Sequence, residues 1–271
     1  MRVAVHAVFI AKENILFLEE WIDYHLQLGF GPFYLYDNSK VEKRDPFDEA
    51  NCRALIPQKI SKHGVNYDKL VKLSDGEIKE ILDKITAKYS DQVHFVEWSP
   101  RDETGAVRYY QVKAHMACKE ILENRGIEWC ASIDMDEFIV LASEFDNNII
   151  NYIQRLDESV SCVNFRQINY ETRFRNMDRP IVTKQNGRTP QEAAKSNPYK
   201  YLYKVNDAID LKVHHCVVKG NTIRPEIPVI HINHYRVNWT RTFDLSNNFI
   251  DPRIVETVVK NYDNYIIKQY L

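Results

Sequence analysis

The first forty residues alternate short apolar runs with one amphipathic stretch. Residues 3–11 are almost continuously apolar and β-branched, which is typical of a strand buried on both faces of a parallel sheet. Apolar residues recur at helical spacing over 15–26, with Asn14 as the expected N-cap and Gly29 as the expected left-handed stop. A second apolar run follows at 33–36. The pattern predicts a βαβ unit with parallel strands and a right-handed crossover.

The same patterns continue along the rest of the chain. They predict strands at 93–98, 129–133, 138–141, 160–166, 211–218 and 229–236, and helices at 108–122, 147–156 and from 254 to the end. The stretch 172–199 is rich in Arg, Lys, Pro and Asn without a sustained period, so we expect a long mobile loop there, either a lid that closes over the donor or a disordered segment. The order of elements predicts an α/β fold whose central, mostly parallel sheet is flanked by helices.

The length of 271 residues fits one α/β domain, which we expect over residues 1–245, followed by a helical extension over residues 246–271. The formal net charge of -2 provides no broad positive field, so nucleic acid is not an expected partner. The five scattered cysteines are expected to be buried thiols in a reducing compartment. No run is apolar enough for a transmembrane segment or fits a signal peptide, so we expect a cytoplasmic protein, soluble or peripheral to a membrane.

Three carboxylates within four residues are the sharpest chemical signal in the sequence. Asp134, Asp136 and Glu137 directly follow the strand expected at 129–133, and ligands of open α/β sheets bind at that edge. Such a cluster repels itself unless a cation or hydrogen-bond donors compensate, and carboxylate oxygens suit magnesium or manganese. The alternative is a solvated acidic turn. Strands on both sides favour the metal site, because burial makes an idle acidic cluster costly.

Glycine-rich phosphate cradles and a serine-nucleophile elbow are both absent from the sequence, so a metal is the expected partner of any bound diphosphate. Asp37, at the end of the second expected strand, fits a ribose contact or ordinary turn chemistry. His234 fits a metal ligand or a structural histidine, and strand alternation places it on the opposite face from His231. Lys200 and Lys204 fit phosphate contacts or solvated surface.

Several of these residues form an ordered set of short motifs. In chain order they are Leu18-x-Glu20-Trp21-Ile22-x-Tyr24-His25-x-x-x-Gly29, Tyr34-x-Tyr36-Asp37-Asn38, Trp129, Asp134-x-Asp136-Glu137-Phe138 and His234-Tyr235. With these motifs the chain resembles glycosyltransferase family 92, also known as domain of unknown function 23, from about residue 3 to 236. One departure lies after the first strand, where the family commonly has Lys-Asn-Glu and this chain has Lys12-Glu13-Asn14.

The resemblance implies a GT-A type glycosyltransferase. Its expected halves are a donor-binding part over about residues 1–140 and an acceptor-binding part over about residues 141–245. It implies a nucleotide-sugar donor, UDP-linked by expectation, a glycan or glycoconjugate acceptor, and inversion at the sugar carbon. The implied cofactor is a divalent metal, manganese first and magnesium as the other option.

The resemblance also assigns site residues. Those implied for the donor are Lys12, Asp37, Asn38, Gln111 and Asp134, and those implied for the metal are Asp134, Asp136 and His234. Inversion requires a carboxylate that deprotonates the acceptor hydroxyl, and Glu171 is our candidate, with Asp178, Asp207, Asp210 and Asp244 as alternatives. Two other classes of function remain open: a metal-dependent nucleotidyltransferase or phosphohydrolase, and a non-catalytic nucleotide- or glycan-binding module.

Overall fold

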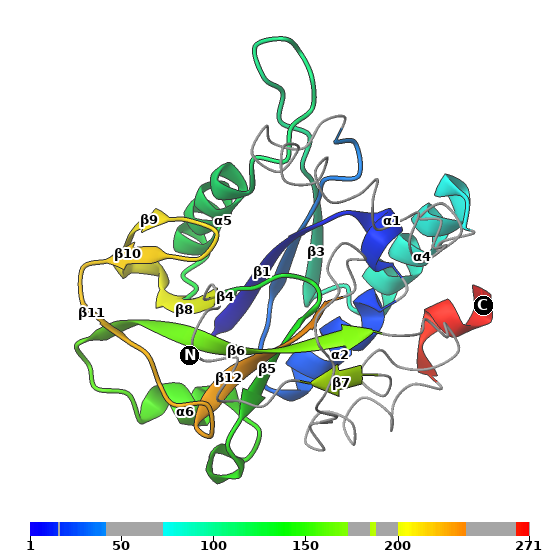
Figure 1. The fold of residues 1–271 in the computed structure, drawn as a ribbon. Helices are drawn as coiled ribbons and strands as arrows, with labels where there is room; N and C mark the ends of the chain where they lie inside the picture. Colours follow the sequence, from blue (N-terminus) through cyan, green and yellow to red (C-terminus); the bar gives the residue numbers. More distant parts are fainter. Residues whose placement is uncertain (16, 42–72, 173–184, 188–199, 237–263, 271) are drawn as a thin grey trace.

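The computed structural model describes residues 1–15, 17–41, 73–172, 185–187, 200–236 and 264–270. These residues form a mixed α/β structure in which a large curled sheet is flanked by helices on both faces (Figure 1). The described part of the sheet has ten strands, eight of them in the continuous order β3-β2-β1-β4-β8-β6-β12-β5. The expected α/β class is therefore confirmed.

One half of the sheet is parallel. It contains β1 (Val3–Phe9), β2 (Phe33–Asp37), β3 (Val93–Glu97) and β4 (Trp129–Ser132). β1 lies between β2 and β4, and all neighbouring pairs in this half run parallel. Every residue of β1 is buried, as its apolar run predicts. The strands all end at the same edge, so the residues that follow them meet there.

Alternate residues of β1 contribute to two different cores. Val3, Val5 and Phe9 belong to the larger core together with helix α2 (Leu18–Gln27) and helix α4 (Asp75–Lys88). The opposite face of the sheet packs against α5 (Gln111–Asn124) and the hairpin described below. The period of two along the strand thus sets which helix covers which face.

The other half of the sheet mixes directions. Its strands are β5 (Glu137–Leu141), β6 (Val160–Thr172), β7 (Gln185–Gly187), β8 (Lys200–Lys204), β11 (Asn221–Ile223) and β12 (Ile230–Arg236). β6 runs parallel to β12 and β11 but antiparallel to β8 and β7, and β12 runs antiparallel to β5. The expectation of a mostly parallel sheet therefore holds only for the first half.

The remaining elements are short. They are α1 (Ala11–Asn14), α6 (Ile149–Gln154), the 3-10 helices η2 (Ser143–Phe145), η4 (Val205–Asp207) and η6 (Ile266–Tyr270), and the separate pair β9 (Ala208–Leu211) and β10 (Cys216–Val218). The pair β9 and β10 corrects the single strand expected at 211–218: Lys212 N donates to His215 O at 2.8 Å and the chain reverses there.

Two helix starts also differ from expectation. Asn14 ends α1 and accepts a hydrogen bond from Ile10 N, so it does not cap α2. α5 begins at Gln111 because Tyr110 has a left-handed backbone with φ of 42°. Gly29, by contrast, has the expected positive φ of 85° just after α2. Most of the expected loop at 172–199 and of the expected C-terminal helix lies outside the described residues.

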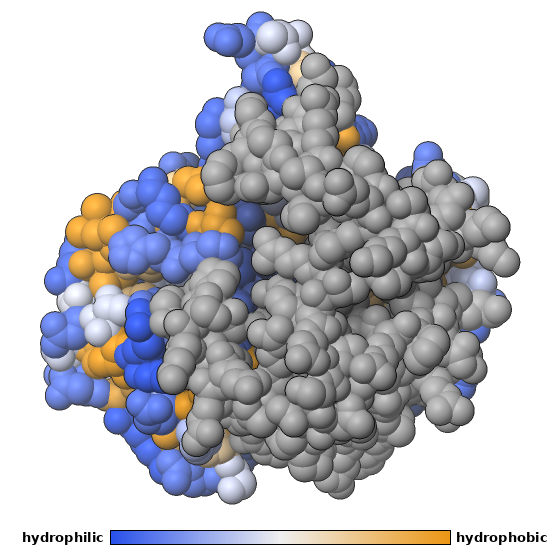
Figure 2. Space-filling model, in the orientation of Figure 1, coloured by the Kyte–Doolittle hydropathy of each residue, from blue (hydrophilic) through white to orange (hydrophobic). Residues whose placement is uncertain are grey.

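Four of the five cysteines lie in the described residues. Cys118, Cys130, Cys162 and Cys216 are buried and free, as expected, and Cys52 lies outside the described residues. On the described surface, hydrophobic residues are visible on the side where β9 and β10 lie (Figures 1 and 2). Ile209 on β9 and Val217 on β10 are 56% and 38% exposed. The helices in the described ranges include none with the length and hydropathy needed to cross a membrane.

Candidate functional site

The acidic cluster lies in the tight connection between β4 and β5, at the edge where the parallel strands end. Glu137 N donates to Asp134 O at 3.1 Å, and the Glu137 carboxylate accepts a hydrogen bond of 2.7 Å from Asp134 N. Gln167 on β6 donates to the other oxygen of the same carboxylate. Glu137 is completely buried, and both oxygens of its carboxylate accept hydrogen bonds that hold the turn together. Asp134 and Asp136 are therefore the candidate ligand-binding groups.

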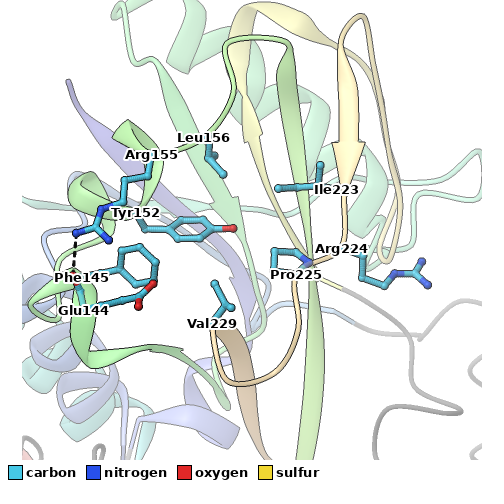
Figure 3. Close-up of a pocket in the computed structure, with 9 residues that line it drawn as sticks. All are labelled: Glu144, Phe145, Tyr152, Arg155, Leu156, Ile223, Arg224, Pro225 and Val229. Atoms are coloured by element: carbon cyan, nitrogen blue, oxygen red, sulfur yellow. Dashed lines mark hydrogen bonds between the residues drawn. The ribbon is translucent and has the colours of Figure 1, made fainter.

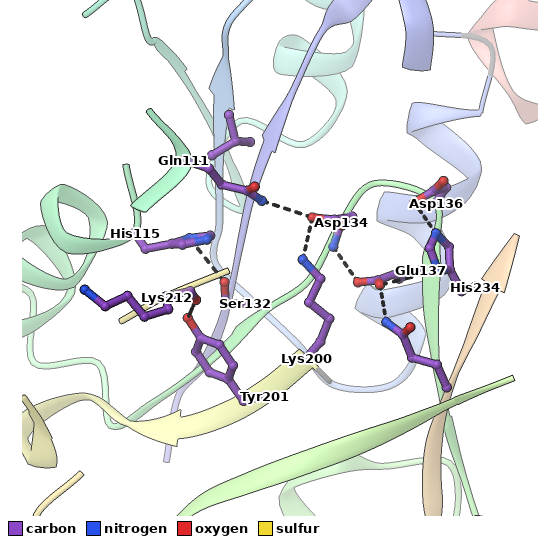
Figure 4. Close-up of polar contacts among 12 residues, drawn as sticks. Gln111, His115, Ser132, Asp134, Asp136, Glu137, Lys200, Tyr201, Lys212 and His234 are labelled. Carbon is purple, nitrogen blue, oxygen red and sulfur yellow. Dashed lines mark hydrogen bonds and ion pairs between the residues drawn. The ribbon is translucent and has the colours of Figure 1, made fainter. Parts of the chain in front are cut away.

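Asp134 faces α5 and β8. Its Oδ1 accepts from Gln111 Nε2 at 3.2 Å and from Lys200 Nζ at 2.7 Å (Figure 4). Burial alone would raise the pKa of Asp134, but the charge and hydrogen bond of Lys200 lower it to about 2. Gln111, which the resemblance implies for the donor pocket, thus contacts the acidic cluster.

Lys200 is the least expected member of the cluster. Its side chain is only 1% exposed, although an exposed, solvated lysine was an expected alternative. Burial lowers the pKa of the Lys200 ammonium, but Asp134 and the neighbouring carboxylates outweigh burial and the net pKa is raised. The ammonium group therefore stays charged inside the protein, which corrects the solvated-surface alternative for this residue.

Asp136 faces the other side of the cluster, towards β12. His234 pairs with Glu137 in the register of β5 and β12, and its Nε2 lies 3.4 Å from Asp136 Oδ1. Its Nδ1 lies 3.8 Å from Glu137 Oε1. Burial raises the pKa of Glu137 to about 7. The structure thus brings together Asp136 and His234, two residues that the sequence places ninety-eight positions apart.

The donor atoms present suit part of a metal site. In the described ranges, no three His, Cys, Asp or Glu side chains are gathered as a ready-made site. Asp136 Oδ1 and His234 Nε2 are 3.4 Å apart. Ligands about 2.1 Å from an octahedral ion lie about 3.0 Å from one another. Asp136 and His234 would therefore suit two ligand positions of a divalent ion whose other ligands are water or substrate phosphate.

The turn after β2 is held by its own hydrogen bonds. The Asp37 carboxylate accepts from Ser39 N at 3.0 Å, which is the ordinary turn chemistry considered above. The Asn38 side chain is fully buried and donates to the carbonyl groups of Trp98 and Arg108. Asn38 therefore supports the loop that leads into α5, and its amide group faces the protein interior.

Two predicted site residues have no described side chain. Lys12 belongs to α1, and Glu171 belongs to β6, where its backbone pairs with Arg236. The backbone of Glu171 lies two residues beyond Asn169, the β6 partner of His234. His231, on the same strand as His234, is buried and contacts Ile227 O and Asn233, so it has a structural role.

A pocket of about 380 Å³ lies elsewhere, at the opposite end of the β5–β12 pair (Figure 3). It is lined by Glu144, Phe145, Tyr152, Arg155, Leu156, Ile223, Arg224, Pro225 and Val229. Leu141 pairs with Ile230 at this end, whereas Glu137 pairs with His234 at the end with the acidic cluster. The acidic cluster does not line this pocket, so the two features are separate.

The Tyr152 ring lies across this pocket, and its hydroxyl is buried with no hydrogen-bond partner among the described residues (Figure 3). Because an unpaired buried hydroxyl costs about 1–3 kcal/mol, we expect Tyr152→Phe to raise the free energy of unfolding by about 1 kcal/mol. Urea denaturation measures this. The matched control is Tyr24→Phe, which removes the 2.6 Å hydrogen bond to Ile139 O and should lower stability by a similar amount. Equal destabilisation by both changes would contradict the conclusion that the Tyr152 hydroxyl is buried without a hydrogen-bond partner.

Comparison with known proteins assigns no family to this chain. No protein-family model matches it, and no curated protein matches it. The function therefore has to be inferred from the fold and from the cluster around Asp134 and Asp136.

Proposed function

We propose that the protein is a metal-dependent glycosyltransferase that moves a sugar from a nucleotide-sugar donor, UDP-linked by our preference, to a glycan hydroxyl. The observation that carries the proposal is the pairing of Asp136 with His234 beside Asp134, at the edge where the parallel strands end. Ligands of open α/β sheets bind at this edge. A GT-A type fold is part of the same proposal, supported by the parallel half that precedes a mixed half.

The proposed roles follow from the contacts. Asp136 and His234 hold the ion, and Asp134, oriented by Gln111 and Lys200, accepts a hydrogen bond from a donor hydroxyl. A divalent ion at this position would stabilise the negative charge that develops on the departing nucleoside diphosphate. Glu171 remains our proposed base, which removes the proton of the acceptor hydroxyl on the opposite face of the sugar and so gives inversion.

Product analysis tests the proposal. The protein is incubated with a panel of nucleotide sugars, manganese and candidate glycan acceptors, and the released nucleotide is identified. Transfer releases nucleoside diphosphate, and we expect this product with at least one donor. Pyrophosphate released from a nucleoside triphosphate would instead indicate a nucleotidyltransferase.

Binding is measured on the same panel by thermal unfolding. A bound donor raises the apparent stability according to its affinity and concentration. Donor binding without turnover of any acceptor would favour a non-catalytic binding module. If no nucleotide sugar raises the unfolding temperature with or without manganese, the proposed function is wrong.

A further inference from the structure

The cluster contains a buried cation of its own. Three carboxylates, Asp134, Asp136 and Glu137, lie within four residues, and Lys200 on β8 reaches into the cluster with 1% of its side chain exposed. Burying an ammonium group costs several kcal/mol unless an opposite charge compensates it. Asp134 provides that charge at 2.7 Å. The pair is therefore a fixed feature of the site and not an incidental surface contact.

Asp134 and Asp136 contact different side chains (Figure 4). Asp134 contacts Lys200 and Gln111, from β8 and α5, and both contacts are made by Oδ1. Asp136 instead faces His234 on β12, at 3.4 Å. A metal ion that binds Asp136 and His234 and also recruited Asp134 would have to share this carboxylate with the Lys200 ammonium, and the two positive charges would repel each other across it.

We propose that Lys200 is a positioning residue that keeps Asp134 out of the metal's ligand set and weakens metal binding at Asp136 and His234. This inference rests on the proposed function for the identity of the site. It gives the two aspartates separate roles, Asp136 as the metal ligand and Asp134 as a hydrogen-bond acceptor for the donor. Weaker metal binding would make the ion depend on the diphosphate of the donor for its remaining ligands.

Manganese binding to the protein alone tests this inference. Free manganese is measured by electron paramagnetic resonance in titrations of the full chain without nucleotide. We expect Lys200→Met to bind manganese about tenfold more tightly, because it removes a repelling charge and frees Asp134 to become a ligand. Lys200→Arg keeps the charge and should bind like the unaltered protein. Asp136→Asn and His234→Ala should lose most of the binding.

The double variant Lys200→Met/Asp134→Asn decides the question if Lys200→Met fails to fold. It removes both charges of the pair, so we expect its manganese affinity to stay within about threefold of the original. An affinity as low as that of Asp136→Asn would mean that Asp134 is itself a ligand and would overturn the inference. So would unchanged or weaker binding by a folded Lys200→Met variant.

Failure of the inference and failure of the proposed function give different results. Manganese binding with the expected pattern, but with no turnover or binding of any nucleotide sugar, would overturn the proposed function alone. Nucleotide-sugar turnover combined with an unaltered affinity in Lys200→Met would overturn the inference alone. No manganese binding by any variant, Lys200→Met included, would overturn the inference, and turnover and thermal unfolding with nucleotide sugars would then decide the proposed function separately.

Discussion

Replacing Asp136 with asparagine is expected to lower the rate of sugar transfer by about a thousandfold at saturating manganese. Asparagine keeps the shape of the side chain but removes the charge that faces His234 at 3.4 Å. Removal of one group that stabilises the transition state typically costs about 10²–10³ in kcat, and here the ion that stabilises the leaving diphosphate would also bind less well. Steady-state assays of nucleoside diphosphate release, over a range of manganese concentrations, measure kcat and kcat/KM.

The matched control is Asp83→Asn. Asp83 lies on α4 with its side chain 64% exposed and forms an ion pair with Lys79, and it makes none of the contacts of the acidic cluster described above. Its replacement should leave transfer unchanged and lower stability by no more than about 0.5 kcal/mol. Thermal unfolding of both variants shows whether they are folded. A folded Asp136→Asn variant that keeps activity within tenfold of the original would remove Asp136 from the proposed mechanism.

The parallel half of the fold could be predicted because its signals are local. β1, β2 and β4 are short apolar runs that turn residues end, and the sheet buries them on both faces. The position of Asp134 at the end of β4 follows directly, since the carboxylates come immediately after a predicted strand. The class of fold and the location of the acidic cluster could therefore be predicted from the sequence alone.

The contacts of the cluster could not be predicted, because they join residues that are distant in the chain. Lys200 looks like a surface lysine in the sequence, and its burial depends on a partner sixty-six residues earlier. In β8 tyrosine alternates with lysine or leucine, and this pattern is only a weak signal that the first lysine of the strand is buried. The hydrogen bonds of Asn38 could not be predicted for a similar reason, since its acceptors are backbone carbonyls sixty and seventy residues away.

The reversal between β9 and β10 was missed because its turn has no Gly, Pro or Asn. The four residues Lys212 to His215 join two short strands, and the continuous stretch at 211–218 favours a single strand by composition. What holds the reversal is a backbone hydrogen bond from Lys212 N to His215 O together with the packing of Leu211 and Cys216 in the core below α5. Tertiary packing therefore overrides the local preference here.

The stability of the protein is expected to fall in mild acid, in part because of His25. Its ring is fully buried on α2, its Nδ1 lies 2.8 Å from Trp21 O, and its Nε2 accepts from Ile139 N at 3.3 Å. Both nitrogens are thus satisfied by the neutral ring that carries its proton on Nδ1. Burial lowers the pKa of His25 from 6.5 to about 3, even though the hydrogen bond to Trp21 favours the charged form.

Since the folded pKa lies below the unfolded value, the unfolded chain binds more protons between these two values, and stability falls as the pH falls through this window. From pH 6.5 to 4.5 this ring lowers the free energy of unfolding by about 2–3 kcal/mol, at about 1.4 kcal/mol for each pH unit.

His25→Gln retains a donor and an acceptor but does not titrate. Its free energy of unfolding, measured with urea, should be lower at pH 7 and should fall less steeply towards pH 4.5. Replacement of the exposed His215 by glutamine is the control and should keep the original slope. Parallel curves for the original protein and His25→Gln would show that His25 does not contribute to this dependence.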